Sequence, residues 1–128
     1  MAPLDENRIV DIILDCAFQI HRRLGPGLLE SVYEEILCYE LKRLDLFVER
    51  QKDITLIYDD LVVPKAFRAD LIVEHLVIVE LKSVSDLHKE YYKVVSTYLK
   101  VSHIRLGLLI NFSAPLLKDG IRRIANNL

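Results

Sequence analysis

Three residues in the middle of the chain have the types and spacing needed to hydrolyse a phosphate ester. Asp70 is followed ten residues later by Glu80, and Lys82 comes two residues after that. Two carboxylates supply the hard oxygen ligands that Mg²⁺ prefers. A bound cation lowers the pKa of water and neutralises charge on a phosphate, and a nearby lysine can orient that water. The same spacing also fits a purely structural ion network in which Lys82 pairs with both carboxylates.

The strands that carry these residues have to bring them together. Residues 67–82 alternate as two strands around a turn at Glu74-His75, typical of a β-hairpin. If Val73 faces Val77, Asp70 and Glu80 stand opposite each other. One face of the hairpin is then wholly apolar, with Phe67, Ala69, Leu71, Val73, Val77, Val79 and Leu81. A shift of one residue would put Glu80 on that face, so burial favours the first register. Opposed like charges are destabilising, and a divalent cation would compensate for them.

A further carboxylate comes from a predicted helix over residues 28–44. On a helical wheel Glu30 falls inside the apolar arc of this helix, between Leu37 and Leu41. A charge near a helix N-terminus or a local salt bridge would explain that position, and so would a site that Glu30 faces. Glu34 and Glu35 lie further round and are expected to be solvated.

The remaining elements predict an α/β fold with helices on both faces of a mixed sheet. An amphipathic helix runs to Leu24 and ends at Gly25-Pro26-Gly27. Strands are expected over residues 48–58, 61–63, 67–73, 76–81 and 104–110, with helices over 86–101 and 116–125. The order is α-α-β-β-β-β-α-β-α. Cys16 and Cys38 fall in the helical stripes and are expected to be core thiols.

Composition limits the class of protein. The chain has 128 residues, is 52% apolar and has a net charge of −2, as expected for one domain over residues 1–128. The absence of a long apolar run and of an export signal predicts a cytoplasmic protein with no membrane segment. Residues 1–82 hold 10 basic and 16 acidic side chains, whereas residues 83–128 hold 7 and 3. Solvated helix faces would explain this asymmetry, and so would an acidic site beside a basic surface.

Four motifs in order resemble a known family. The first, Gly27-Leu28-Leu29-Glu30-Ser31-Val32-Tyr33, reads as the GxxExxY signature. The stretches 67–70 and 79–82 read as the separated acid and the ExK motif of the PD-(D/E)XK nuclease superfamily. The stretches 98–99 and 107–112 resemble later blocks of the same GxxExxY proteins. The similarity spans residues 8–125 and implies a restriction-endonuclease-like core.

The resemblance assigns roles to residues of this chain. It implies that Asp70 and Glu80 bind Mg²⁺, with Mn²⁺ as an alternative, that Lys82 assists the attacking water, and that Glu30 joins the catalytic site. Tyr33 and Tyr98 match motif tyrosines and are expected to support the site. The chain departs from the family pattern at Val94, where members commonly carry a glutamine.

These features predict a Mg²⁺-dependent nuclease that cleaves DNA or RNA. Basic residues near the C-terminal end would contact phosphates, namely Lys89, Lys93, Lys118, Arg122 and Arg123. Cleavage of both strands would call for a homodimer or a protein partner. The alternative is an inactive nuclease-like domain that binds nucleic acid or a protein, which Val94 favours. The third hypothesis is a structural domain in which Asp70, Glu80 and Lys82 form an ion network.

Overall fold

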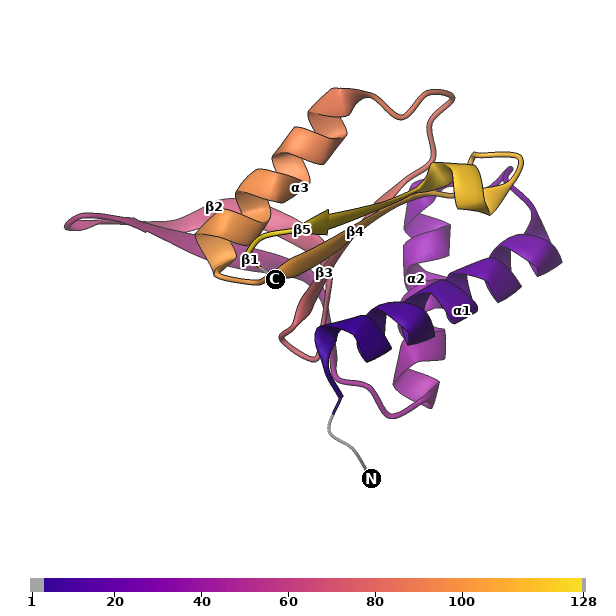
Figure 1. The fold of residues 1–128 in the computed structure, drawn as a ribbon, viewed down its shortest axis with the longest axis horizontal. Coiled ribbons are helices and arrows are strands. Elements are labelled where there is room, and N and C mark those ends of the chain that lie inside the picture. Colours follow the sequence, from indigo (N-terminus) through magenta and orange to yellow (C-terminus); the bar gives the residue numbers. More distant parts are fainter. Residues whose placement is uncertain (1–3, 128) are drawn as a thin grey trace.

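A computed structural model describes residues 4–127. In this range the chain forms a five-stranded mixed sheet with helices on both faces (Figure 1). The helices are α1 (Glu6–Leu24), α2 (Glu30–Arg43) and α3 (Lys89–Ser102), with a short 3₁₀ helix η1 (Leu117–Gly120). The strands, β1 (Val48–Tyr58), β2 (Leu61–Val73), β3 (Val77–Lys82), β4 (Leu106–Asn111) and β5 (Ile121–Ala125), lie in the order β1-β2-β3-β4-β5. β3 and β4 run parallel, and the other neighbours are antiparallel. The predicted α/β class is therefore confirmed.

Two apolar clusters hold the layers together. α1 and α2 pack on one face of the sheet, where side chains such as Ile13, Leu37 and Val79 are fully buried. α3 covers the other face through Val95 and Leu99. Both cysteines are buried and free, as predicted. In the described range, no helix combines the length and apolarity needed to cross a membrane.

The hairpin of β2 and β3 has the predicted register, with Val73 opposite Val77 and Leu71 opposite Val79. The predicted single apolar face is nevertheless wrong. Leu71 belongs to the cluster under α1 and α2, whereas Ala69 and Phe67 pack with the cluster under α3. Regular alternation would keep all three on one face. β2 therefore changes face between Ala69 and Leu71, where its pairing with β1 is interrupted at Asp70.

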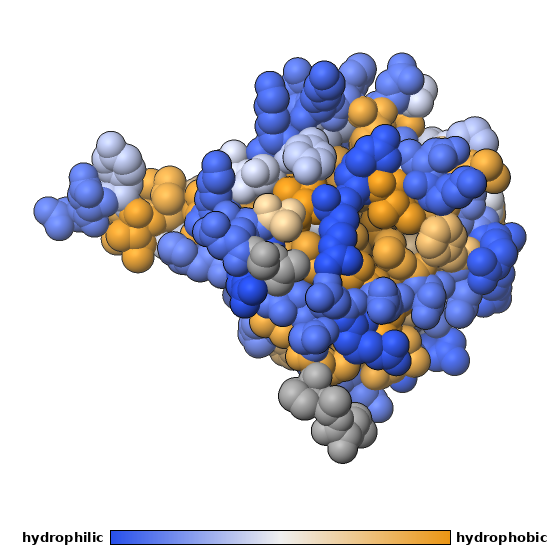
Figure 2. Space-filling view, viewed as in Figure 1, coloured by the Kyte–Doolittle hydropathy of each residue, from blue (hydrophilic) through white to orange (hydrophobic). Residues whose placement is uncertain are grey.

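β2 is also longer than predicted. The two strands expected over 61–63 and 67–73 form one, and Pro64 lies inside it. β3 pairs with β2 only from Leu71 onward, so Pro64 lies where β2 has β1 as its partner, next to an irregularity in that pairing. The β1–β2 hairpin projects from the fold, and its exposed end is apolar at Ile57, Tyr58, Leu61 and Val62 (Figures 1 and 2).

The prediction of a helix over residues 116–125 is wrong. Residues 117–120 form η1, and residues 121–125 form the edge strand β5, antiparallel to β4. The unpaired edge of β4 offers backbone hydrogen bonds that a short helix could not satisfy. Gly120 marks the change, because a Cβ at this position would lie 2.5 Å from the Asn111 carbonyl oxygen. α3 begins at Lys89, three residues later than the predicted start at residue 86.

Candidate functional site

Asp70 and Glu80 lie side by side where β2 and β3 stop pairing. The last paired residues are Leu71 and Val79. Beyond this pair, the side-chain carboxylates of Asp70 and Glu80, rather than backbone carbonyls, accept the hydrogen bonds from the backbone N–H groups of the neighbouring strand. The Asp70 N–H donates to Glu80 Oε1 at 3.0 Å, and the Leu81 N–H donates to Asp70 Oδ2 at 2.9 Å. These bonds fix both carboxylates, and the other oxygen of Asp70, Oδ1, accepts from Gln51 Nε2 at 3.4 Å.

Lys82 and Glu30 reach the same site from β3 and α2. The Lys82 ammonium lies 4.6 Å from the centroid of the Tyr91 ring of α3, a cation–π contact that holds its long side chain. Glu30 is the first residue of α2 and is half-buried. Burial raises the pKa of Glu30, the charge of Lys82 opposes that rise, and Asp70 adds to it. The four predicted catalytic residues therefore act on one another electrostatically.

The carboxylate pair is electrostatically costly. Burial is the largest cause that raises the pKa of Glu80, and the negative charge of Asp70 adds to it. Burial also raises the pKa of Asp70, against the hydrogen bond from Leu81. Two buried acids next to each other favour a proton or a cation between them. This is the setting that a divalent ion would neutralise.

The donor set fits a hard divalent cation. Asp70 and Glu80 offer carboxylate oxygens, and Mg²⁺ commonly uses one or two carboxylates and keeps several waters. Across residues 4–127, no three His, Cys, Asp or Glu side chains gather as a metal-binding group. A cation here would thus rely on two protein carboxylates and on water.

The sequence analysis did not predict a group of hydrogen-bonded side chains beside Asp70, made of Glu34, Arg50 and Gln51. Glu34, predicted to be solvated, is 5% exposed. Its Oε2 accepts from Arg50 Nε at 2.7 Å, and its Oε1 accepts from Gln51 Nε2 at 2.6 Å. The available signal was spacing, because Glu34 lies three residues before Leu37 and four before Cys38, and such residues share a side of a helix.

Comparison with known proteins identifies one family. The family model described as the PD-(D/E)XK nuclease superfamily matches residues 7–124, almost the whole chain. The chain belongs to the PD-(D/E)XK nuclease superfamily. The match begins at Asn7 in α1, includes the β2–β3 hairpin and ends at Ile124 in β5. Searches of curated proteins and of solved structures found no significant match. Nucleases of the PD-(D/E)XK superfamily typically use divalent metal ions, and membership suggests nuclease activity.

The two motif tyrosines of this superfamily member have different surroundings. Tyr98 stacks on Phe67 with centroids 3.8 Å apart. Burial and the charges of Glu80 and Asp70 raise the pKa of Tyr98, so it lies near the carboxylates. Tyr33 instead stacks on Phe112, and its hydroxyl donates to the Gly25 carbonyl and accepts from the Leu28 N–H. Tyr33 therefore holds the loop that precedes Glu30.

We expect Tyr33→Phe to lower the free energy of unfolding by about 1–2 kcal/mol. The substitution keeps the stack on Phe112 and removes both hydrogen bonds to the loop, so the half-buried Gly25 carbonyl and the Leu28 N–H lose this partner. Urea denaturation would measure the change. Tyr39→Phe, on the exposed side of α2, is the matched control and should be neutral. Equal stability of the two variants would contradict this role.

The predicted phosphate-binding residues lie in three places. Lys89, Lys93 and Arg122 line one hollow of about 430 Å³ beside α3. Arg123 points to the opposite side of the sheet and bonds Asn7 of α1. Successive side chains of a strand alternate in direction, so the strand that replaced the predicted helix separates Arg122 from Arg123. Lys118 is exposed on η1.

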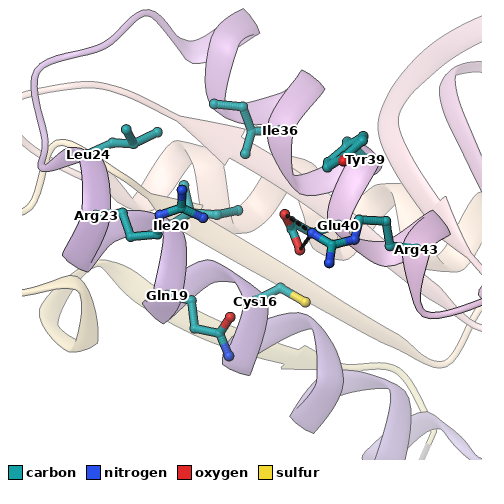
Figure 3. A pocket seen from close by; sticks show the side chains of 9 residues that line it. All are labelled: Cys16, Gln19, Ile20, Arg23, Leu24, Ile36, Tyr39, Glu40 and Arg43. Carbon is teal, nitrogen blue, oxygen red and sulfur yellow. Dashed lines mark hydrogen bonds and ion pairs between the residues drawn. The ribbon is translucent and has the colours of Figure 1, made fainter.

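A larger cavity of about 550 Å³ lies between α1 and α2 (Figure 3). Neither Asp70 nor Glu80 lines it. On the α2 side of this cavity, Arg43 Nη1 forms an ion pair with Glu40 Oε1 at 3.2 Å. Burial, aided by Glu40, raises the pKa of the Cys16 thiol, which keeps it in its unreactive protonated form. The residues of this cavity offer no arrangement of nucleophile and base, so the carboxylate cluster remains the candidate active site.

Proposed function

We propose that the protein is a metal-dependent nuclease that hydrolyses phosphodiester bonds in DNA or RNA. The observation that carries the proposal is the pair Asp70 and Glu80, each held by a backbone N–H of the other strand, with Lys82 and Glu30 electrostatically coupled to it. The match to the PD-(D/E)XK superfamily supports the same activity. The four sequence motifs further favour the GxxExxY group of that superfamily.

The proposed roles follow from the chemistry of the side chains. Asp70 and Glu80 would hold Mg²⁺, or Mn²⁺ as an alternative. A cation there lowers the pKa of water and neutralises charge on the phosphate. Lys82 would orient the attacking water and stabilise the negative charge of the transition state. Glu30, whose pKa is raised chiefly by burial, would exchange a proton with a group at the site.

The basic hollow beside α3 would position the nucleic-acid backbone. Lys89, Lys93 and Arg122 present three cations from two elements. Such contacts orient a phosphate backbone without reading its sequence. Cleavage of both strands of a duplex would require a homodimer or a protein partner.

A second candidate function is nucleic-acid binding without cleavage. The observation behind it is Val94, which by its spacing shares a side of α3 with Tyr91 and Tyr98 and is 44% exposed. An apolar side chain there can neither hold water nor donate to a phosphate. Binding of labelled DNA or RNA without any metal-dependent product would favour this alternative.

Calorimetric titration with Mn²⁺ tests the proposed metal site. We expect the wild-type protein to bind the ion and Asp70→Asn to bind it at least about tenfold more weakly, because a neutral amide is a poorer ligand than a carboxylate. Asp53→Asn on the same hairpin is a matched control and should bind like the wild type. Cleavage of labelled single- and double-stranded DNA and RNA, with and without metal, then identifies the substrate. Equal binding by the Asp70 variant would refute the site.

A further inference from the structure

The backbone of two strands is distorted at the same point of the sheet. β1 and β2 pair through Arg50 with Leu71 and through Lys52 with Ala69, but Gln51 and Asp70 between them are unpaired. Gln51 has a φ of 51°, in the left-handed region that non-glycine residues rarely adopt. Such a conformation persists only where its surroundings hold it. The distortion lies beside a candidate metal-binding residue.

The distortion directs the Gln51 side chain between two acids. Gln51 Nε2 lies 2.6 Å from Glu34 Oε1 and 3.4 Å from Asp70 Oδ1. An amide nitrogen has two hydrogens, so it can donate to both acids at once. Both acceptors are carboxylates, which settles that the nitrogen rather than the oxygen of the amide faces them.

Glu34 is the anchor of this arrangement. It is 5% exposed, and each of its oxygens has a partner, Arg50 on one side and Gln51 on the other. Arg50 neutralises the charge that burial would otherwise penalise. Both Glu34 oxygens therefore accept hydrogen bonds, and the bond to Gln51 keeps its amide in place.

The consequence falls on Asp70. Its Oδ2 accepts from the Leu81 N–H, and its Oδ1 faces the Gln51 amide. We propose that Gln51, anchored by Glu34 and Arg50, is a positioning residue that orients the Asp70 carboxylate for metal binding. This inference rests on the proposed function. The Gln51 nitrogen carries hydrogens toward Asp70 and is not itself a ligand; one lone pair of Asp70 Oδ1 remains for the cation.

Two substitutions at one position separate side-chain positioning from backbone structure. Gln51→Met keeps the length of the side chain and removes the amide. Gln51→Gly also removes the amide but adopts a positive φ without strain. If Gln51 positions Asp70, both variants should bind Mn²⁺ about 10- to 100-fold more weakly, the usual effect of losing a group that orients a metal ligand. The glycine variant should bind Mn²⁺ more weakly while its melting temperature stays that of the wild type.

Calorimetric titration with Mn²⁺ and thermal melting of the same samples give the readings. Gln19→Met, an exposed glutamine of α1, is the matched control and should keep wild-type affinity. Wild-type affinity in both Gln51 variants would overturn the positioning role and leave the metal site intact. Failure of the wild-type protein itself to bind Mn²⁺ would overturn the proposed function and this inference with it.

Discussion

Replacing Lys82 by alanine is expected to slow metal-dependent cleavage by about 10²- to 10³-fold. Burial raises the pKa of both Asp70 and Glu80, the positive charge of Lys82 opposes that rise, and the contact of Lys82 with the Tyr91 ring, at 4.6 Å, keeps the ammonium in place. Loss of a charge that acts in the transition state lowers kcat and kcat/KM together. Metal affinity should not fall, because Lys82 is a cation and not a ligand.

Single-turnover cleavage at saturating Mn²⁺ measures this effect. Lys42→Ala, an exposed lysine near the end of α2, is the matched control and should cleave at the wild-type rate. Lys93→Ala, in the basic hollow, should instead weaken substrate binding and leave the chemical step in place. A Lys82→Ala protein that cleaves as fast as the wild type would contradict the proposed role of this residue.

The second large effect is a loss of stability as the pH rises in the absence of metal. Burial, together with the charge of Asp70, raises the pKa of Glu80 from 4.5 to about 8. Between these values the folded protein keeps a proton that the unfolded chain has released. The free energy of unfolding therefore decreases as the pH rises through this interval, by on the order of a few kcal/mol. Below about pH 4 both states are protonated and this contribution to stability is fully present.

Urea denaturation in the presence of a chelator, at several pH values from 5 to 8.5, would show this dependence; the range follows from the interval above. Glu80→Gln should flatten the profile and be more stable than the wild type at pH 8, since the amide never ionises. Mg²⁺ should restore stability to the wild-type protein at pH 8, because it binds the ionised carboxylates of the folded state. Glu35→Gln, exposed on α2, is the control. A flat wild-type profile would rule out the raised pKa.

Much of the fold follows from local patterns. The apolar stripe of α1 and the stop at Gly25 predict that helix within a few residues of its bounds. The register of β2 and β3 follows from which choice buries Leu71 and Val79. The helix over Leu116–Ala125 was wrong because the open edge of β4 lies far away in sequence, and only the assembled sheet shows that it needs a partner.

The candidate catalytic residues, and the proximity of Asp70 and Glu80, could be predicted from the sequence. A β-hairpin has one register that buries its apolar residues, and this register places Asp70 next to Glu80. The tertiary structure alone decided how Asp70 is oriented. That orientation depends on the positive φ of Gln51, on the burial of Glu34 and on Arg50, which pairs with Glu34 from another element. Periodicity assumes regular strands, so it cannot reveal a distortion that contacts between α2 and β1 hold in place.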